Sequence, residues 1–106
     1  MNYQIKNILW STDFSAESLT ALNYANYLAK HFKASIKAVH VVPDFAPALY
    51  ETRAMMVADL VKRQEDLQLK ARARLEKIAA KNPVKFSKIM IETGSPGKRI
   101  ADLAEE

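Results

Sequence analysis

The chain has 106 residues, of which 49% are hydrophobic, and its 16 lysines and arginines outnumber 12 acidic residues to give a formal net charge of +4. This length suits at most one domain with a core of its own. The lack of cysteine excludes a disulfide framework and thiolate chemistry, and no segment approaches the roughly 20 apolar residues that span a bilayer. We therefore expect a cytoplasmic protein with no membrane partner.

The first two elements are predicted from a short apolar run and a longer periodic one. Residues 5–11 (IKNILWS) end in polar residues and predict a buried strand. Ser15 suits a helix N-cap, with Glu17 in the first turn facing the positive end of the helix dipole. A helix is expected from this cap to Phe32, and its apolar stripe consists of Leu19, Leu22, Ala25, Ala29 and Phe32.

The middle of the chain predicts a second strand and a long helix. Residues 35–42 are β-branched and apolar and are closed by Pro43, which favours a strand followed by a loop. Residues 51–80 contain no glycine or proline and predict one long helix, or two joined by a kink, that ends at Asn82-Pro83. Its apolar stripe, expected to pack on the sheet or on another subunit, consists of Met56, Leu60, Leu67, Ala71, Leu75 and Ile78.

The last elements complete an alternating pattern. Residues 84–92 predict a third strand, and Gly94, Ser95 and Pro96 follow as turn, N-cap and first helical residue. The pattern of this helix is interrupted at Glu106, so we expect the chain to be the first two thirds of a larger domain. Strands that alternate with helices pair in parallel and predict an α/β fold.

Charge and turn chemistry narrow the possible functions. Between residues 62 and 81 the cations alternate with acidic residues, which is typical of the solvated face of a long helix rather than of a nucleic-acid interface. His31 and His40 lack paired ligands at metal-binding spacing, so no metal site is expected. Ser15 lies in no nucleophile elbow, and no catalytic residue is identified.

The loop after the first strand is the best candidate for a binding site, because parallel sheets bind ligands at the carboxyl ends of their strands. It contains no glycine, which excludes a Rossmann fingerprint or a Walker loop at this position. Asp13 is suited to accept hydrogen bonds from a ribose or to help hold a divalent cation. The alternative is that Asp13 is a local turn residue beside Ser15.

The chain resembles the universal stress protein family in five segments that occur in the family's order. They are Lys6-Asn7-Ile8-Leu9, Thr12-Asp13-Phe14-Ser15, the helix Ser18-Leu19-x-Ala21-Leu22-x-x-Ala25, His40-Val41-Val42-Pro43, and Gly94-x-Pro96-x-x-x-Ile100-x-x-x-Ala104-Glu105. The resemblance implies a three-layer α/β/α fold with a parallel sheet in the order 3-2-1-4-5. Strands 4 and 5 would then be absent, and residues 1–106 would form a single domain truncated in its third helix.

The resemblance also implies a ligand. In the nucleotide-binding branch of the family, Asp13 would bind the ribose, Ser11 and Thr12 would line the adenosine pocket, and the Val41 backbone would contact the adenine edge. The ligand would be ATP or a related adenine nucleotide, with or without Mg²⁺. Position 11 is often proline in relatives, so Ser11 is a departure, and the family's triphosphate loop follows strand 4.

Three functions remain open at this point. The first, which we favour, is a stress-response regulator that binds an adenine nucleotide and at most hydrolyses it slowly. The second is a nucleotide-independent homodimeric interaction module, suggested by Ser11, the basic surface and the long helix. The third is an adenine-dependent enzyme such as a nucleotidyl transferase or ATP pyrophosphatase, whose H-x-G-H or S-G-G-x-[D/S] signature this sequence lacks.

Overall fold

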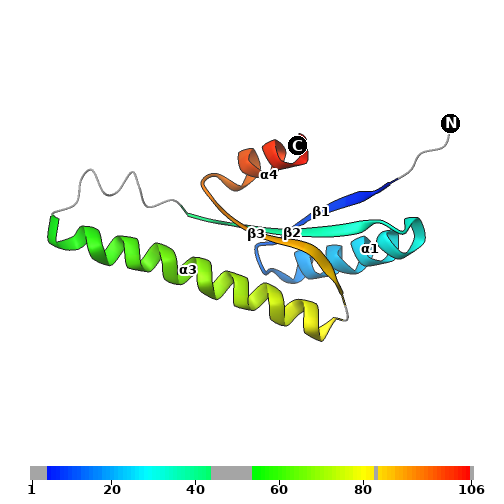
Figure 1. The fold of residues 1–106 in the computed structure, drawn as a ribbon, viewed down its shortest axis with the longest axis horizontal. Helices are drawn as coiled ribbons and strands as arrows, with labels where there is room; N and C mark the ends of the chain where they lie inside the picture. Colours follow the sequence, from blue (N-terminus) through cyan, green and yellow to red (C-terminus); the bar gives the residue numbers. More distant parts are fainter. Residues whose placement is uncertain (1–4, 44–53, 83, 106) are drawn as a thin grey trace.

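A computed structural model describes residues 5–43, 54–82 and 84–105, with only the backbone described at positions 54, 55 and 96. Its described elements follow the order β1, α1, β2, α3, β3, α4 (Figure 1). The strands β1 (Asn7–Ser11), β2 (Ser35–Val42) and β3 (Phe86–Thr93) form one parallel sheet in the order β1-β2-β3. The predicted α/β fold with a parallel sheet is confirmed.

The first strand is shorter than its sequence predicts. Ile5 and Lys6 lie outside β1, because β2 begins at Ser35, which pairs with Asn7. The Ser35 N–H donates to the Lys6 carbonyl at 3.0 Å, and this bond closes the ladder at that end. A residue belongs to a strand only where a neighbouring strand pairs with it. The apolar run in the sequence does not show where that neighbour begins.

Helix α1 (Ala16–Phe32) begins at the predicted cap. The Ser15 hydroxyl accepts a hydrogen bond from the Ser18 N–H, which satisfies one of the unpaired donors of the first turn. The predicted apolar stripe is buried only in its centre, at Leu22, Ala25 and Ala29. Its two ends, Leu19 and Phe32, are exposed, so the helix buries a narrower face than its periodicity predicts.

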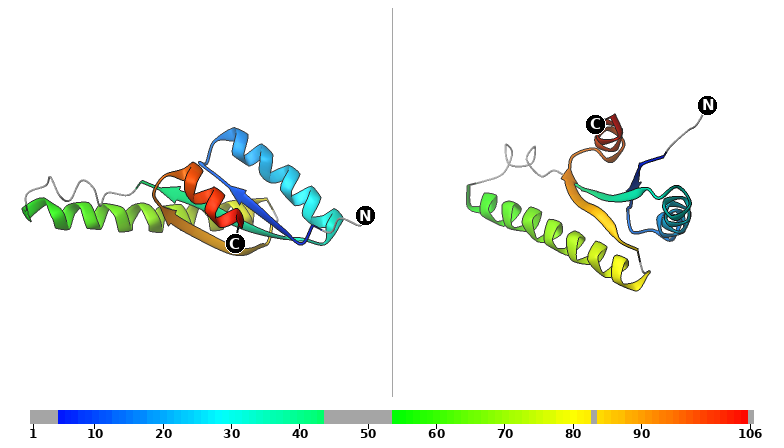
Figure 2. Two further views of the ribbon diagram at one scale, coloured as in Figure 1. Left: turned by 90° about the horizontal axis from the view of Figure 1, so that it is seen from above. Right: turned by 45° about the vertical axis from the view of Figure 1, so that its right-hand side comes forward.

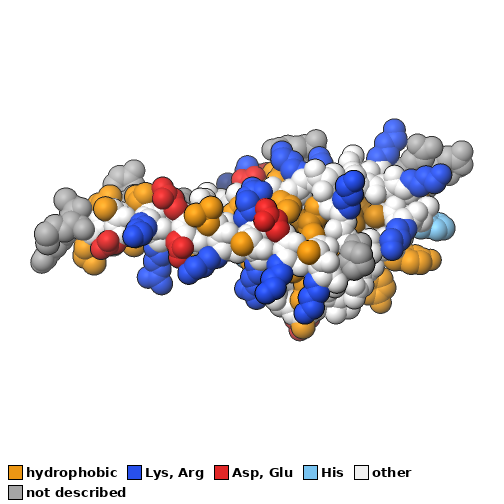
Figure 3. All heavy atoms as spheres, turned by 60° about the horizontal axis from the view of Figure 1, so that its bottom comes forward, with side chains coloured by type: hydrophobic (Ala, Val, Ile, Leu, Met, Phe, Trp, Pro, Cys, Tyr) orange, Lys and Arg blue, Asp and Glu red, His pale blue; other side chains and the backbone are white. Residues whose placement is uncertain are grey.

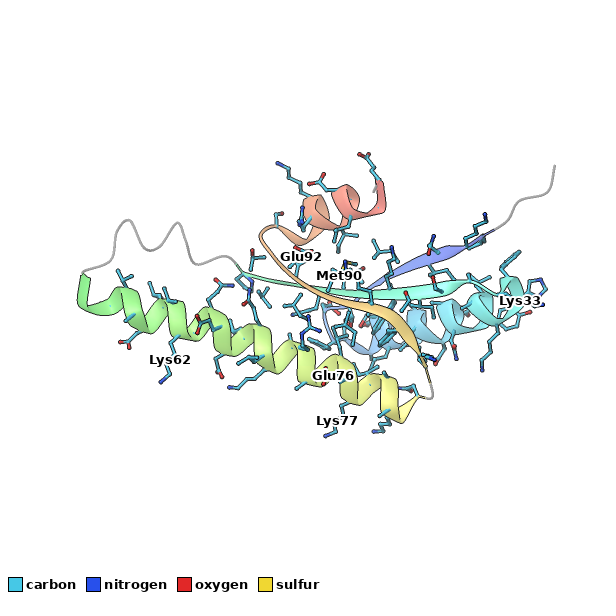
Figure 4. All side chains as sticks on the ribbon, viewed as in Figure 1. Lys33, Lys62, Glu76, Lys77, Met90 and Glu92 are labelled. Carbon is cyan, nitrogen blue, oxygen red and sulfur yellow. The ribbon has the colours of Figure 1, made fainter. Side chains whose placement is uncertain are left out.

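Helix α3 (Ala54–Lys81) is a single helix across its described length. Ala71 and Leu75 of its predicted stripe are buried, but Met56 is 55% exposed and does not pack on the sheet, so its packing on another subunit stays a prediction. The reason for this exposure is the length of the helix, whose N-terminal half extends past the carboxyl ends of the strands (Figure 1). Lys62 and Lys77 point from this helix away from the sheet (Figure 4).

The exposed face of α3 carries lysines and arginines interspersed with acidic side chains (Figure 3). One pair, Lys70 and Asp66, lies at i and i+4 spacing with 2.9 Å between Nζ and Oδ2. Both partners are exposed, so this ion pair stabilises the helix only slightly. The mixed signs agree with the solvated helix face that the sequence predicts.

The third strand starts two residues later than predicted, at Phe86. Val84, which precedes this strand, belongs to the C-terminal cap of α3. Its N–H donates a hydrogen bond to the Ala79 carbonyl of that helix at 3.2 Å. The Val84 side chain is buried in the main core. An apolar residue that closes a helix in this way is difficult to distinguish by sequence from the first residue of a strand.

The helices cover the sheet on both sides and form the three predicted layers. Helices α1 and α3 lie on one face, and α4 (Pro96–Glu105) lies on the other (Figures 1 and 2). Arg99 of α4 is tied to Glu92 of β3, with 3.2 Å between Nη2 and Oε2. Among the helices in the described ranges, none combines the length and the apolar character needed to cross a membrane.

The main core lies between the sheet and the helices α1 and α3. Trp10 of β1 and Phe86 of β3 stack over the intervening β2, with ring centroids 5.7 Å apart. The residue paired with Trp10 on β2 is Ala38, whose small side chain leaves room for both rings. The buried members of this core are Trp10, Leu22, Ala25, Ala29, Ile36, Ala38, Leu75 and Val84.

Candidate functional site

A cavity of about 430 Å³ opens at the carboxyl ends of β1 and β2. All four residues predicted from the sequence line it, namely Ser11, Thr12, Asp13 and Val41. Ile100 of α4 lines it from the opposite layer. Its volume falls in the range of about 300–1,000 Å³ that is common for small-molecule sites. The structure therefore brings the four predicted residues together at one place, and it is the place where parallel sheets bind ligands.

The loop that follows β1 is held by the Thr12 hydroxyl. Thr12 is buried, and its Oγ1 accepts a hydrogen bond from the Phe14 N–H at 2.9 Å. The same oxygen lies 2.8 Å from Ser18 Oγ, which itself donates to the Ser15 carbonyl. Since a serine hydroxyl has one hydrogen, Thr12 must be the donor to Ser18. The Thr12 hydroxyl thus shapes the cavity wall and has no hydrogen left to offer a ligand.

Asp13 is exposed beside this loop, and its carboxylate faces solvent at the cavity. Its Oδ1 accepts a hydrogen bond from the Ser15 N–H at 2.9 Å, which forms the local turn that the sequence offered as an alternative role. The two roles are compatible, because a carboxylate can accept about four hydrogen bonds, and those from the Ser15 backbone and side chain leave acceptor positions free.

The pKa of the Asp13 carboxyl lies below its ordinary value, because hydrogen bonds from the Ser15 side chain and backbone favour the charged form. We expect a carbon-13 NMR titration of this carboxyl to have its midpoint below the usual aspartate range. Because the pKa of Asp13 is lower in the folded protein than in the unfolded chain, the charged Asp13 stabilises the fold. This contribution is complete above the unfolded-state pKa and is lost as the pH falls through the folded-state pKa.

The Ser15→Ala variant is the control for this titration. It removes the hydroxyl donor and keeps the backbone donor. The pKa of Asp13 should therefore rise toward its ordinary value but stay below it. A midpoint at or above the usual aspartate range in the unmodified protein would contradict the hydrogen bonding described here.

Val41 contributes its backbone more than its side chain, which is 9% exposed. The Thr12 N–H donates to the Val39 carbonyl at 3.0 Å, so the peptide groups of Val39 face β1. Alternate residues of a strand direct their peptide groups to the same neighbour. The peptide groups of Val41 therefore face the side of β1 as well, at a level beyond the last paired residue Ser11.

His40 is a residue of this site whose role the sequence analysis missed. Its Nδ1 lies 2.7 Å from the Thr12 carbonyl, and the residue lines the cavity. The sequence analysis considered His40 as a possible metal ligand, which it excluded, and as part of a family motif, but it assigned His40 no role in the site. Its position at the end of a strand that borders the predicted loop was the available signal. Glu17 and Ser18 also line the cavity from the first turn of α1.

Comparisons with known proteins give a consistent picture. The model of the universal stress protein family matches residues 4–106. The solved structure of the universal stress protein UspA from Lactobacillus plantarum is similar to 98% of this chain and to 71% of its own, with a TM-score of 0.68 and 26% identity. The structure of the hypothetical protein MJ0577 has the same fold, with a TM-score of 0.73 and 22% identity over 97% of this chain and 68% of that one. A search of curated proteins finds no match.

Proposed function

Because this chain belongs to the universal stress protein family, we propose that it is a stress-response regulator that binds ATP or a related adenine nucleotide in the cavity after β1 and β2. The observation that carries the proposal is that Ser11, Thr12, Asp13 and Val41 line one cavity of about 430 Å³. Family membership supports the regulatory role, and the cavity supports the ligand.

The chemistry of the cavity fits the nucleoside part of such a ligand. Asp13 has an exposed carboxylate that favours its charged form, which is a strong acceptor for the two hydroxyls of a ribose. The peptide groups of Val41, beyond the end of β1, are a donor and an acceptor for the edge of an adenine ring. Ile100 adds an apolar surface for the base from the side of α4.

The cavity is less suited to the phosphates. Asp13 and Glu17 are its charged lining residues, and both are acidic, so they repel a triphosphate placed beside them. Without a cation, we infer that the phosphates extend away from these carboxylates. A Mg²⁺ ion that accompanies them would find carboxylate oxygens, the ligands it prefers, on the same two residues. The role of such an ion would be to reduce this repulsion.

The proposal is tested by titrating ATP into the protein in a calorimeter and repeating the titration with Asp13→Ala. We expect the unmodified protein to bind and the variant to bind about tenfold to hundredfold more weakly, because a hydrogen bond to a charged group contributes about 1.5–3 kcal/mol. Asp13→Asn retains one acceptor oxygen for the Ser15 N–H and should lose less.

The matched control is Asp59→Ala, which removes an exposed carboxylate on α3 remote from the cavity and should leave affinity unchanged. Absence of ATP binding to the unmodified protein would overturn the proposal. The nucleotide-independent homodimer would then be preferred, because Met56, Val61 and Leu69 expose apolar side chains along α3. Sedimentation as a stable dimer would support that alternative.

A further inference from the structure

Three side chains, one from α3, one from β2 and one from the loop after β1, pack against one another in a row beside the candidate nucleotide site, and this row is called the stack. The guanidinium carbon of Arg74, on α3, lies 4.3 Å from the centroid of the Phe14 ring. On β2, the ring of His40 packs against Phe14 with centroids 4.5 Å apart and an angle of 41° between the planes. His40 in turn reaches the Thr12 carbonyl, so the stack joins α3 to the loop after β1.

The residue in the middle of this stack has an unusual backbone. Phe14 has a φ angle of 67°, which lies in the left-handed region that residues with a bulky side chain seldom adopt. Such a conformation persists only where surrounding contacts hold it. Three contacts do so here: the Arg74 guanidinium, the His40 ring, and the hydrogen bond from the Phe14 N–H to Thr12 Oγ1.

The conformation of Phe14 determines where Asp13 lies. The hydrogen bond between Asp13 Oδ1 and the Ser15 N–H, 2.9 Å long, spans Phe14. If Phe14 returned to a right-handed or extended conformation, Ser15 would turn away and this bond would break. The Asp13 carboxylate would then lose the partner that fixes its orientation toward the cavity.

The His40 contact also has a defined protonation pattern. The Thr12 carbonyl can only accept a hydrogen bond, so the proton of this contact is assigned to His40 Nδ1. This assignment gives the stack a spectroscopic signature, because a ring protonated at Nδ1 is distinguished from one protonated at Nε2 by its nitrogen-15 shifts. A loop that released Thr12 would lose that signature.

We propose that Arg74 is a positioning residue for the candidate site, acting through Phe14 and His40 to hold Asp13 in place. The position of α3 is then coupled to the affinity of the cavity: a partner or ligand that displaces α3 weakens binding at Asp13, and an occupied cavity holds α3 in place. The part of this inference that concerns affinity rests on the proposed nucleotide function. The part that concerns the loop stands without any ligand.

The test compares Arg74→Ala with Arg74→Lys and Arg72→Ala. Lysine keeps a positive charge but lacks the planar guanidinium whose central carbon lies over the Phe14 ring. Arg72 is the matched control, since it is an exposed arginine on the same helix whose Nη2 lies 3.4 Å from the Ile89 carbonyl rather than near the loop. The first measurement, on ligand-free protein, is the hydrogen-exchange rate of the Phe14 amide together with the His40 nitrogen-15 shifts.

We expect Arg74→Ala to raise the exchange rate roughly threefold to tenfold and to weaken the Nδ1-protonated signature, with Arg74→Lys between it and the unmodified protein. Arg72→Ala should change neither. The second measurement is ATP affinity, which should fall by a similar factor in Arg74→Ala alone. Equal exchange rates and shifts in Arg74→Ala and Arg72→Ala would overturn the inference. If the unmodified protein binds no ATP, the nucleotide proposal fails, and the ligand-free measurements still decide whether Arg74 holds the loop that carries Phe14 and Asp13.

Discussion

Replacing Trp10 by alanine is expected to lower the free energy of unfolding by about 3–5 kcal/mol, the usual cost of deleting a buried large aromatic side chain. Trp10 is 3% exposed and stacks on Phe86 across the sheet. Its Nε1 also donates to the Ser18 carbonyl at 2.9 Å, in the first turns of α1. One side chain therefore joins β1, β3 and α1, and its removal leaves a cavity in the centre of the main core.

The variant Trp10→Phe separates the contribution of apolar packing from that of the hydrogen bond made by Nε1. Phenylalanine keeps most of the apolar contact and loses the N–H donor, so its cost should be about 1–2 kcal/mol. Both variants are measured by denaturation in urea with linear extrapolation, using circular dichroism as the signal, because each variant removes the chain's single tryptophan. Equal losses for the two variants would show that the hydrogen bond, and not the packing, accounts for the effect.

Leu75→Ala is expected to cost about 2–5 kcal/mol. Leu75 is 0% exposed and anchors α3 in the core next to Arg74 in sequence. Leu69→Ala is a closely matched control, since it makes the same substitution on the same helix at a side chain that is 68% exposed. The change in helix propensity is the same in both, so the difference between them measures burial alone.

Leu69→Ala should remain within about 0.5 kcal/mol of the unmodified protein, as most exposed substitutions do. A cost for Leu75→Ala below that of Leu69→Ala would contradict the packing of α3 on β2 and β3. Because Leu75 holds the segment that carries Arg74, its variant should also raise the exchange rate of the Phe14 amide.

The sequence predicted those features of the fold that depend on local chemistry. The Ser15 cap and the strand over residues 35–42 are confirmed, and so is the start of α4 at Pro96. The errors in element bounds occur where contacts with a neighbouring strand or helix determine the end of an element. Ile5 lies outside β1 because the neighbouring strand does not reach it, and Val84 closes a helix rather than opening a strand.

The candidate site also has features that the sequence could predict and features that it could not. The proximity of Asp13 and Val41 could be predicted, because Asp13 follows β1 and Val41 lies near the end of β2, and the two strands end at one edge of a parallel sheet. The stack of Arg74 on Phe14 could not, since 60 positions separate the two residues in a sequence whose helix spacing alone does not fix the rotation of α3. Thr12 was predicted to line the pocket, but the structural role of its hydroxyl was not predicted, because its contacts with the Phe14 N–H and Ser18 Oγ depend on the conformation of the loop.

The extension of α3 past the sheet affects how the molecule moves in solution. The principal axes measure 57 × 31 × 21 Å and the radius of gyration is 16.3 Å, whereas a compact chain of this length has about 13 Å. A particle of this shape has more friction than a sphere of equal mass and leaves a sizing column early. A monomer would therefore resemble a dimer by elution volume, and sedimentation equilibrium, which depends on mass and not on shape, would separate elongation from association.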